Sequence, residues 1–274
     1  MSALLRRLFR LSLLLLLVVA GVTIELLIFP LLDDTRRRRV IRRWSAALLA
    51  TCGLRLRVHD RAAGAPSALA SLAALAPGRM LVANHISWLD IFAINAVATS
   101  AFVAKAELRR WPVAGLLVAL AGTVFIERAR RHAVHRVIGH LRERIRAGFP
   151  VAVFPEATTS DGRMLLPFYG NLLEAAIEED TEIVPLALRY LDEHGNPAQA
   201  VTYVGDTSFV QSLWLVVGAT GLVAEVHVLE PLATAGRNRH VLARELRALI
   251  SSRLGLPIEG TAPETAAGSP AASR

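Results

Sequence analysis

One histidine and one aspartate in this sequence have the types and spacing of a general base and the carboxylate that orients it. His85 and Asp90 are separated by four residues and follow the apolar run 80–83, which is typical of a buried strand. An imidazole changes its charge near pH ~6.5, so it can accept a proton from a hydroxyl at neutral pH. A neighbouring carboxylate fixes its tautomer and stabilises the imidazolium that forms. The pair therefore indicates a chain that activates an alcohol.

The same residues also have a purely structural interpretation. Ser87-x-x-Asp90 matches a capping box, with Ser87 at the N-cap of a helix and Asp90 at its third position. The two interpretations are compatible, but only if His85 lies before the helix begins, because five positions along a helix would turn the two side chains to different faces. Both stay open at this point.

An alternation of short β-like runs with helix-like runs begins near residue 80. It predicts an α/β fold: a mostly parallel, twisted sheet of about seven strands flanked by helices. An amphipathic helix is expected between two of the strands, with Gly148 as its stop signal. The predicted strands are 80–83, 101–104, 123–127, 151–154, 182–190, 201–204 and 223–229.

Polar residues follow four of these strands. His85 comes after the first, Lys105 after the second, Arg128 after the third and Glu156 after the fourth. The carboxyl ends of parallel strands meet at one edge of a sheet, where ligands bind in open α/β folds. Lys105 stands out because it is the single lysine among 31 basic residues. The sequence thus predicts one site at that edge.

The N-terminal part of the chain predicts a helical membrane anchor. Residues 11–32 are almost wholly apolar and approach the roughly 20 residues of a spanning helix. Glu25 interrupts this run and a shorter apolar stretch follows at 44–56, so a helical hairpin dipping into one leaflet is the alternative. The heavier arginine flank lies on the C-terminal side, which favours a cytoplasmic body and opposes a cleaved secretory signal.

Composition limits the classes of partner and site that this chain is expected to have. The chain of 274 residues is 53% hydrophobic with a net charge of +8, which favours anionic lipid over nucleic acid. One cysteine excludes an intramolecular disulfide and a multi-cysteine zinc site, and we expect no metal. Neither a Gly-x-Ser-x-Gly elbow nor a Walker A loop is found. The expected domains are an anchor with a basic linker at 1–56, an α/β domain at 57–257 and a disordered tail at 258–274.

Four motifs together resemble those of the glycerolipid acyltransferase family, which includes the 1-acylglycerol-3-phosphate acyltransferases. The resemblance runs from about residue 80 to 190, with the motifs in order, and the remaining strands extend it to about 250. The motifs are Asn84-His85-x-x-x-x-Asp90, Gly122-x-x-Phe125-Ile126-x-Arg128, Phe154-Pro155-Glu156 and Val184-Pro185-Leu186.

The resemblance implies a reaction for the first motif. His85, oriented by Asp90, would deprotonate the hydroxyl of an acceptor, whose oxygen would attack the thioester of acyl-CoA or acyl carrier protein. Neither an acyl-enzyme nor a cofactor is implied.

The resemblance also implies the substrate contacts. Arg128 would hold the acceptor phosphate, with Lys105 as an additional contact. Glu156 and Thr158 would position the glycerol or hydroxyl region, and Pro185 would shape the acyl or acceptor pocket.

The third motif departs from the usual Phe-Pro-Glu-Gly-Thr-Arg-Ser pattern of the family. Ala157 replaces the glycine and Thr159 replaces the arginine. Losing the arginine removes a bidentate phosphate donor, which makes a less anionic acceptor plausible. An alanine in place of glycine is strained if the position requires a positive φ.

The expected function is acyl transfer to a lysolipid at the inner membrane, with the catalytic domain on the cytoplasmic face. The first acceptor to consider is 1-acyl-sn-glycerol-3-phosphate, giving phosphatidic acid, and the second is lyso-ornithine lipid. Two other hypotheses stay open: a non-catalytic membrane protein that binds anionic lipid, and an esterase that uses water as the acceptor. The expected partners are the lysolipid, the acyl donor and membrane lipids.

Overall fold

A computed structural model describes residues 2–60, 78–105, 124–126 and 131–259. Arg128 lies outside the described residues, as does nearly all of the predicted tail. For Lys105 the structure describes the backbone but not the side chain.

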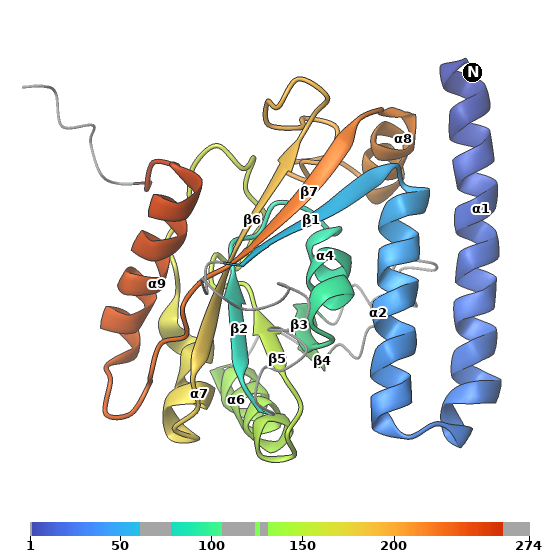
Figure 1. The fold of residues 1–274 in the computed structure, drawn as a ribbon. Coiled ribbons are helices and arrows are strands. Elements are labelled where there is room, and N and C mark those ends of the chain that lie inside the picture. The colour runs from blue at the N-terminus through green and yellow to red at the C-terminus, as the bar shows by residue number, and fades with distance from the viewer. Residues whose placement is uncertain (1, 61–77, 106–123, 127–130, 260–274) are drawn as a thin grey trace, which may run out of the picture.

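The described part of the chain folds around a twisted sheet of seven strands in the order β1-β7-β6-β2-β5-β3-β4 (Figure 1). All neighbouring strands are parallel except β6 and β7, which are antiparallel. This confirms the predicted mostly parallel sheet. The strands are β1 Leu54–Asp60, β2 Met80–Ala83, β3 Ala101–Lys105, β4 Val124–Ile126, β5 Val151–Val153, β6 Ile183–Leu191 and β7 Leu222–Val228.

One predicted strand was wrong, and one strand was not predicted. The segment 201–204 forms a turn and a loop, in which Val201 N donates to Ala198 O and Tyr203 N donates to Ile86 O. β1 was missed because its alternation of apolar and basic residues continues the apolar stretch 44–56 without a break. The expected boundary between residues 56 and 57 falls inside this strand.

Helices cover both faces of the sheet, and strand side chains alternate between them. Leu81 and Ala83 of β2 pack with α2, α4 and α8, whereas Met80 and Val82 pack with α6 and α9. This explains why β2 is apolar at every position. The helices are α1 Ala3–Thr23, α2 Asp34–Thr51, α4 Asp90–Val97, α6 Arg131–Arg146, α7 Glu174–Glu178, α8 Phe209–Gly218 and α9 Arg239–Leu254.

The predicted crossover helix is confirmed as α6. Its buried stripe consists of Val137, Ile138, Leu141 and Ile145. The chain then turns at Gly148, whose φ is 76° and whose N–H donates to Ile145 O.

At the N-terminus, α1 and α2 form an antiparallel helical pair alongside the α/β domain (Figure 1). A π-helical turn, Ile24–Ile28, and a 3-10 turn, Phe29–Leu31, join them. The second apolar stretch belongs to α2 and β1 and faces protein, since Leu48 and Leu49 are each 1% exposed. On α1, by contrast, most of the apolar surface stays open.

Candidate functional site

His85 and Asp90 form a direct pair at the carboxyl end of β2. Nδ1 of His85 lies 2.8 Å from Oδ2 of Asp90. Since an ionised carboxylate only accepts hydrogen bonds, we assign the proton to Nδ1, which leaves the lone pair on Nε2. The Asp90 side chain is fully buried, while the His85 side chain is 20% exposed. The imidazole can therefore meet a substrate while its carboxylate partner cannot.

Helix α4 holds this pair in a way that corrects the predicted capping box. The helix begins at Asp90 rather than after Ser87, and its N-cap is Leu89. Ser87 Oγ is buried and finds no hydrogen-bond partner among the described residues. The other hydrogen bond of a capping box, from the backbone N–H of Ser87 to the Asp90 carboxylate, does form. Oδ2 of Asp90 accepts from Ser87 N at 3.0 Å and also from Ile86 N at 2.7 Å. His85 thus precedes the helix, as the catalytic interpretation requires.

A tyrosine that the sequence analysis did not single out completes the carboxylate's contacts. The hydroxyl of Tyr190, near the carboxyl end of β6, donates to Oδ1 of Asp90 at 2.7 Å. Burial, together with the negative charge of Asp90, raises the pKa of the Tyr190 phenol well above its ordinary value. The phenol therefore stays protonated and remains a donor. The signal available in the sequence was its place on the α4 face of β6, in alternation with Leu186 and Leu188.

Glu156 lies behind His85 rather than on an open surface. Its side chain is 2% exposed, and Oε1 accepts from the backbone N–H of His85 at 3.1 Å. Burial raises the pKa of Glu156 to about 8, against a smaller opposing effect of the bond from His85. The carboxyl group thus contacts the backbone of the candidate base.

The loop after β5 holds His85 from a second side. The backbone N–H of Ser160 donates to His85 O at 2.7 Å. The ring of Phe154 stacks on the imidazole, with centroids 4.1 Å apart and planes 12° apart. Together with Glu156, these contacts fix both the backbone and the ring of His85.

The two departures in the third motif have structural consequences. Ala157 adopts φ 59°, so the strain expected for an alanine at this position is present. Thr159 donates its hydroxyl proton to Tyr203 O and thereby ties the third-motif loop to the loop after residue 201. Thr158, expected to contact the acceptor, is exposed.

The other predicted site residues are placed as follows. Lys105 is the last residue of β3, so its backbone lies at the same edge of the sheet as His85. Arg128 lies outside the described residues. Pro185 is buried within β6 opposite Val82 of β2.

Asn84, given no role from the sequence, connects the end of β2 to β6. Its side-chain amide donates to Leu188 O at 2.9 Å and accepts from Leu188 N at 2.8 Å. It thereby extends the strand pairing beyond the last residue of β2. This fixes the start of the loop that carries His85.

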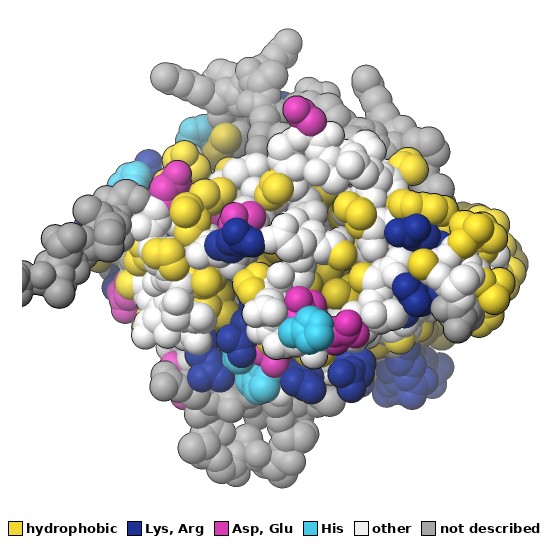
Figure 2. Space-filling model, turned by 90° about the horizontal axis from the view of Figure 1, so that it is seen from above, with side chains coloured by type: hydrophobic (Ala, Val, Ile, Leu, Met, Phe, Trp, Pro, Cys, Tyr) yellow, Lys and Arg dark blue, Asp and Glu magenta, His cyan; other side chains and the backbone are white. Residues whose placement is uncertain are grey.

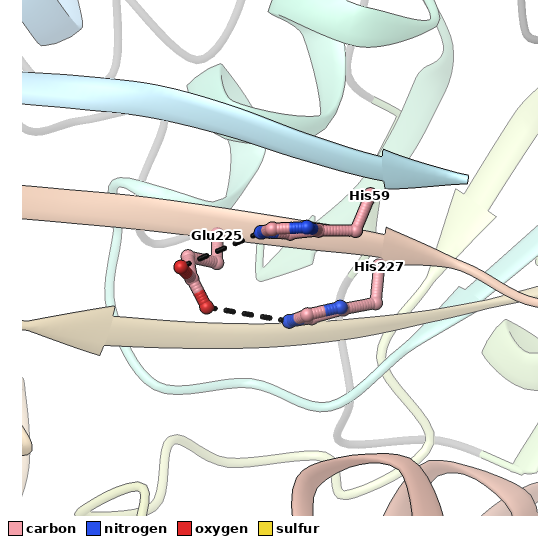
Figure 3. Close-up of side chains that lie close together, drawn as sticks. All are labelled: His59, Glu225 and His227. Carbon is pink, nitrogen blue, oxygen red and sulfur yellow. Dashed lines mark ion pairs between the residues drawn. The ribbon is translucent and has the colours of Figure 1, made fainter. Parts of the chain in front are cut away.

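On the other half of the sheet, three potential metal ligands gather on β1 and β7 (Figure 3). Nε2 of His59 and Nε2 of His227 each lie 3.4 Å from a Glu225 oxygen. Arg253 donates to Nδ1 of His227 at 3.1 Å, so neutral His227 must carry its own proton on Nε2.

The surroundings of this cluster also oppose a cation. Burial and the charge of Arg253 lower the pKa of His227 to about 4, and Arg189 lies 2.7 Å from the Glu225 carboxylate. A metal-bound histidine needs an acceptor, not an arginine, at its other nitrogen. The cluster is a Glu225 carboxylate paired with Arg57 and Arg189, with neutral His227 beside it, rather than a metal site.

Comparisons with known proteins place the chain among acyltransferases. A family profile described as Acyltransferase matches residues 71–189. A 1-acyl-sn-glycerol-3-phosphate acyltransferase of Neisseria gonorrhoeae is 41% identical over 54% of this chain, and the match spans 58% of that protein's length. A lyso-ornithine lipid O-acyltransferase of Pseudomonas aeruginosa is 34% identical over 84% of this chain and 82% of that protein.

The fold has a solved counterpart. The crystal structure of the 1-acyl-sn-glycerophosphate acyltransferase from Thermotoga maritima matches 91% of this chain and 96% of that chain, with a TM-score of 0.61. At 21% identity this likeness concerns the fold alone.

Proposed function

The chain belongs to the glycerolipid acyltransferase family, and from this premise we propose that it moves a fatty acyl group from a thioester to the hydroxyl of a lysolipid. The observation that carries the proposal is the hydrogen bond between His85 Nδ1 and the buried Asp90 carboxylate. It leaves Nε2 as the basic atom of a partly exposed imidazole. This is the arrangement a general base needs.

The reaction follows from that geometry. Nε2 of His85 takes the proton of the acceptor hydroxyl while the oxygen attacks the thioester carbonyl carbon. Asp90 stabilises the imidazolium that forms. When the carbon–sulfur bond breaks, the imidazolium returns the proton to the departing thiolate, which leaves as a thiol. The donor is acyl-CoA or acyl carrier protein, and His85 is regenerated without a covalent intermediate.

Two acceptors fit this proposal, each supported by a different observation. Lyso-ornithine lipid is supported by the Pseudomonas aeruginosa relative, matched over most of both chains, and by Thr159, which stands where the family pattern has a phosphate-binding arginine. Lysophosphatidate is supported by the more identical Neisseria gonorrhoeae relative. The phosphate of lysophosphatidate would contact Arg128 and Lys105.

We also propose attachment to one membrane leaflet through α1, with the α/β domain on the cytoplasmic side of the inner membrane. Leu14, in the middle of α1, is 8% exposed and packs in the same core cluster as α2 and α8. Arg6 Nη2 donates to Gly218 O in α8. A helix bound to the side of a folded domain along its length supports shallow insertion rather than a full span.

An acceptor-dependence assay tests the activity. Purified protein reconstituted in vesicles receives acyl-CoA or acyl carrier protein, and free thiol and acylated lipid are measured with lysophosphatidate, with lyso-ornithine lipid, and without acceptor. The proposal expects thiol release that requires one lysolipid and matches the diacyl product in amount. Equal thiol release without acceptor, yielding free fatty acid, indicates an esterase. No thiol release with either donor contradicts acyl transfer.

A further inference from the structure

Helix α8 has an unusual outer face for a helix at a protein surface. Its sequence, residues 209–218, contains no charged side chain. On its outer face, Val210 is 74% exposed, Leu215 41% and Trp214 39%, and Gln211 is the one exposed polar side chain among them. A surface helix that faces water normally carries polar or charged residues on this side. An apolar outer face indicates a partner that is itself apolar.

This face is continuous with α1. The guanidinium of Arg7 lies 4.7 Å from the ring centroid of Trp214, so the α8 face borders the first turns of α1. Arg10 Nη1 donates to the carbonyls of Val217 and Ala219 at the end of α8. Figure 2 shows hydrophobic side chains gathered on the side of the molecule where α1 lies, with basic side chains beside them. The exposed apolar residues of α1 include Leu4, Leu5, Leu8, Phe9, Leu15, Leu16 and Val19.

The same helix is attached to the loop that carries the candidate base. Nε1 of Trp88 donates to Ser212 Oγ at 3.1 Å, and its ring meets Phe209 edge-on with centroids 5.2 Å apart. Trp88 lies between His85 and Asp90 in the sequence. α8 therefore carries an exposed apolar face on its outer side and contacts the loop of His85 on its inner side.

We propose that the outer face of α8 contacts the lipid leaflet directly, as a second membrane-binding surface that belongs to the catalytic domain itself. The inference rests on the proposed attachment through α1. The occupant is lipid because the apolar side chains are bordered by Arg7 over Trp214 and by Arg6 and Arg10, which also bind the last carbonyls of α8. Apolar side chains edged by cationic groups match an acyl region edged by anionic headgroups. Such contact brings the His85 loop to the surface where a lysolipid resides.

Spin labels in reconstituted vesicles test the contact. The single native cysteine, Cys52, is fully buried, and burial raises the pKa of its thiol to about 12, so it does not compete for the label. Nitroxides are attached to Val210→Cys on α8, to Leu15→Cys on α1, and to Val241→Cys on α9. Val241 is the control at a 45% exposed position of α9, a helix that packs on the opposite face of the sheet from α8 (Figure 1). Collisions with oxygen, which concentrates in lipid, are compared with collisions with a water-soluble nickel complex.

The expected result is oxygen-dominated relaxation at positions 210 and 15 and nickel-dominated relaxation at 241. If position 15 reports lipid while 210 behaves like 241, the α8 inference is wrong and the attachment through α1 stands. If positions 15 and 210 both report water, the membrane attachment fails and the inference with it. A signal at 210 that instead depends on protein concentration, through dipolar broadening, identifies a second copy of the chain as the occupant and also overturns the inference.

A charge substitution gives a second, independent readout. Val210→Glu should weaken binding to vesicles that contain phosphatidylglycerol by about tenfold or more, because the variant loses a buried apolar side chain and a carboxylate opposes burial. Val241→Glu should leave vesicle binding unchanged. Equal binding by the two variants contradicts the proposed contact.

Discussion

The hydroxyl of Tyr190 donates a hydrogen bond of 2.7 Å to Oδ1 of Asp90, the carboxylate oxygen that His85 does not use. The other oxygen, Oδ2, accepts from His85 Nδ1 and from two backbone N–H groups. Both ends of the buried carboxylate are therefore held, one by the chain around His85 and one by strand β6. We expect Tyr190 to act through Asp90 as a positioning residue.

Replacing Tyr190 with phenylalanine tests this role. A hydrogen bond to a charged group contributes about 1.5–3 kcal/mol, so kcat should fall by roughly ten- to a hundredfold while KM stays near the parent value. Tyr169→Phe, at a 59% exposed position, is the control. A merely structural tyrosine would leave kcat of the folded variant at the parent value.

Asp90→Asn should lower kcat far more than Tyr190→Phe does. The amide keeps the size of the side chain, but its NH2 group can turn toward His85 and favour the wrong tautomer. An aspartate-to-asparagine change in another His–Asp pair lowers kcat by about 10⁴. We expect a loss of that order, measured as acylated product formed per enzyme molecule per unit time. A variant that folds and keeps more than about a tenth of the parent rate contradicts the orienting role.

Glu156 should make the stability of the protein depend on pH. Its folded-state pKa of about 8 lies above the ordinary glutamate value, so its neutral form is favoured by folding. The corresponding stability is complete below about pH 4 and is lost as the pH rises toward 8. Denaturant unfolding at pH 5 and pH 8.5 should show this decline in the parent and a smaller one in Glu156→Gln. The same decline in both proteins would assign it to other groups.

Ala157→Gly should stabilise the fold modestly. The left-handed conformation costs an alanine about 1–2 kcal/mol, and the greater freedom of glycine in the unfolded chain offsets part of this. The expected gain in the free energy of unfolding is about 0.5–1 kcal/mol. Urea unfolding measures it, with Ala147→Gly, just after α6, as a control that should destabilise or change nothing. A loss of stability in Ala157→Gly would show that this backbone is not strained.

Local patterns predicted most of what positions the base. The apolar run of β2, the strand ends carrying polar residues and the amphipathic α6 all follow from period-two and helical spacing within a few residues. The need for His85 to precede the helix also followed from the geometry of a single turn. These features depend on near neighbours in the sequence.

Contacts between segments that are distant in the sequence could not be predicted. Tyr190 and Asp90 are 100 positions apart, and nothing near either residue specifies their approach. Glu156 was expected to face the acceptor, but packing places it behind His85. β1 could not be separated from the apolar stretch before it, and the His59–Glu225–His227 cluster was missed with it. Each of these results is set by which strands become neighbours in the sheet.

The central claim, that His85 is the general base, is tested most directly by single-turnover kinetics of His85→Ala with the preferred donor and acceptor. His140→Ala, on the exposed face of α6, is the matched control. A general base contributes about 10²–10⁴ in rate, so His85→Ala should lose that factor while His140→Ala keeps the parent rate. A folded His85→Ala protein that acylates the lysolipid at the parent rate would contradict the assignment.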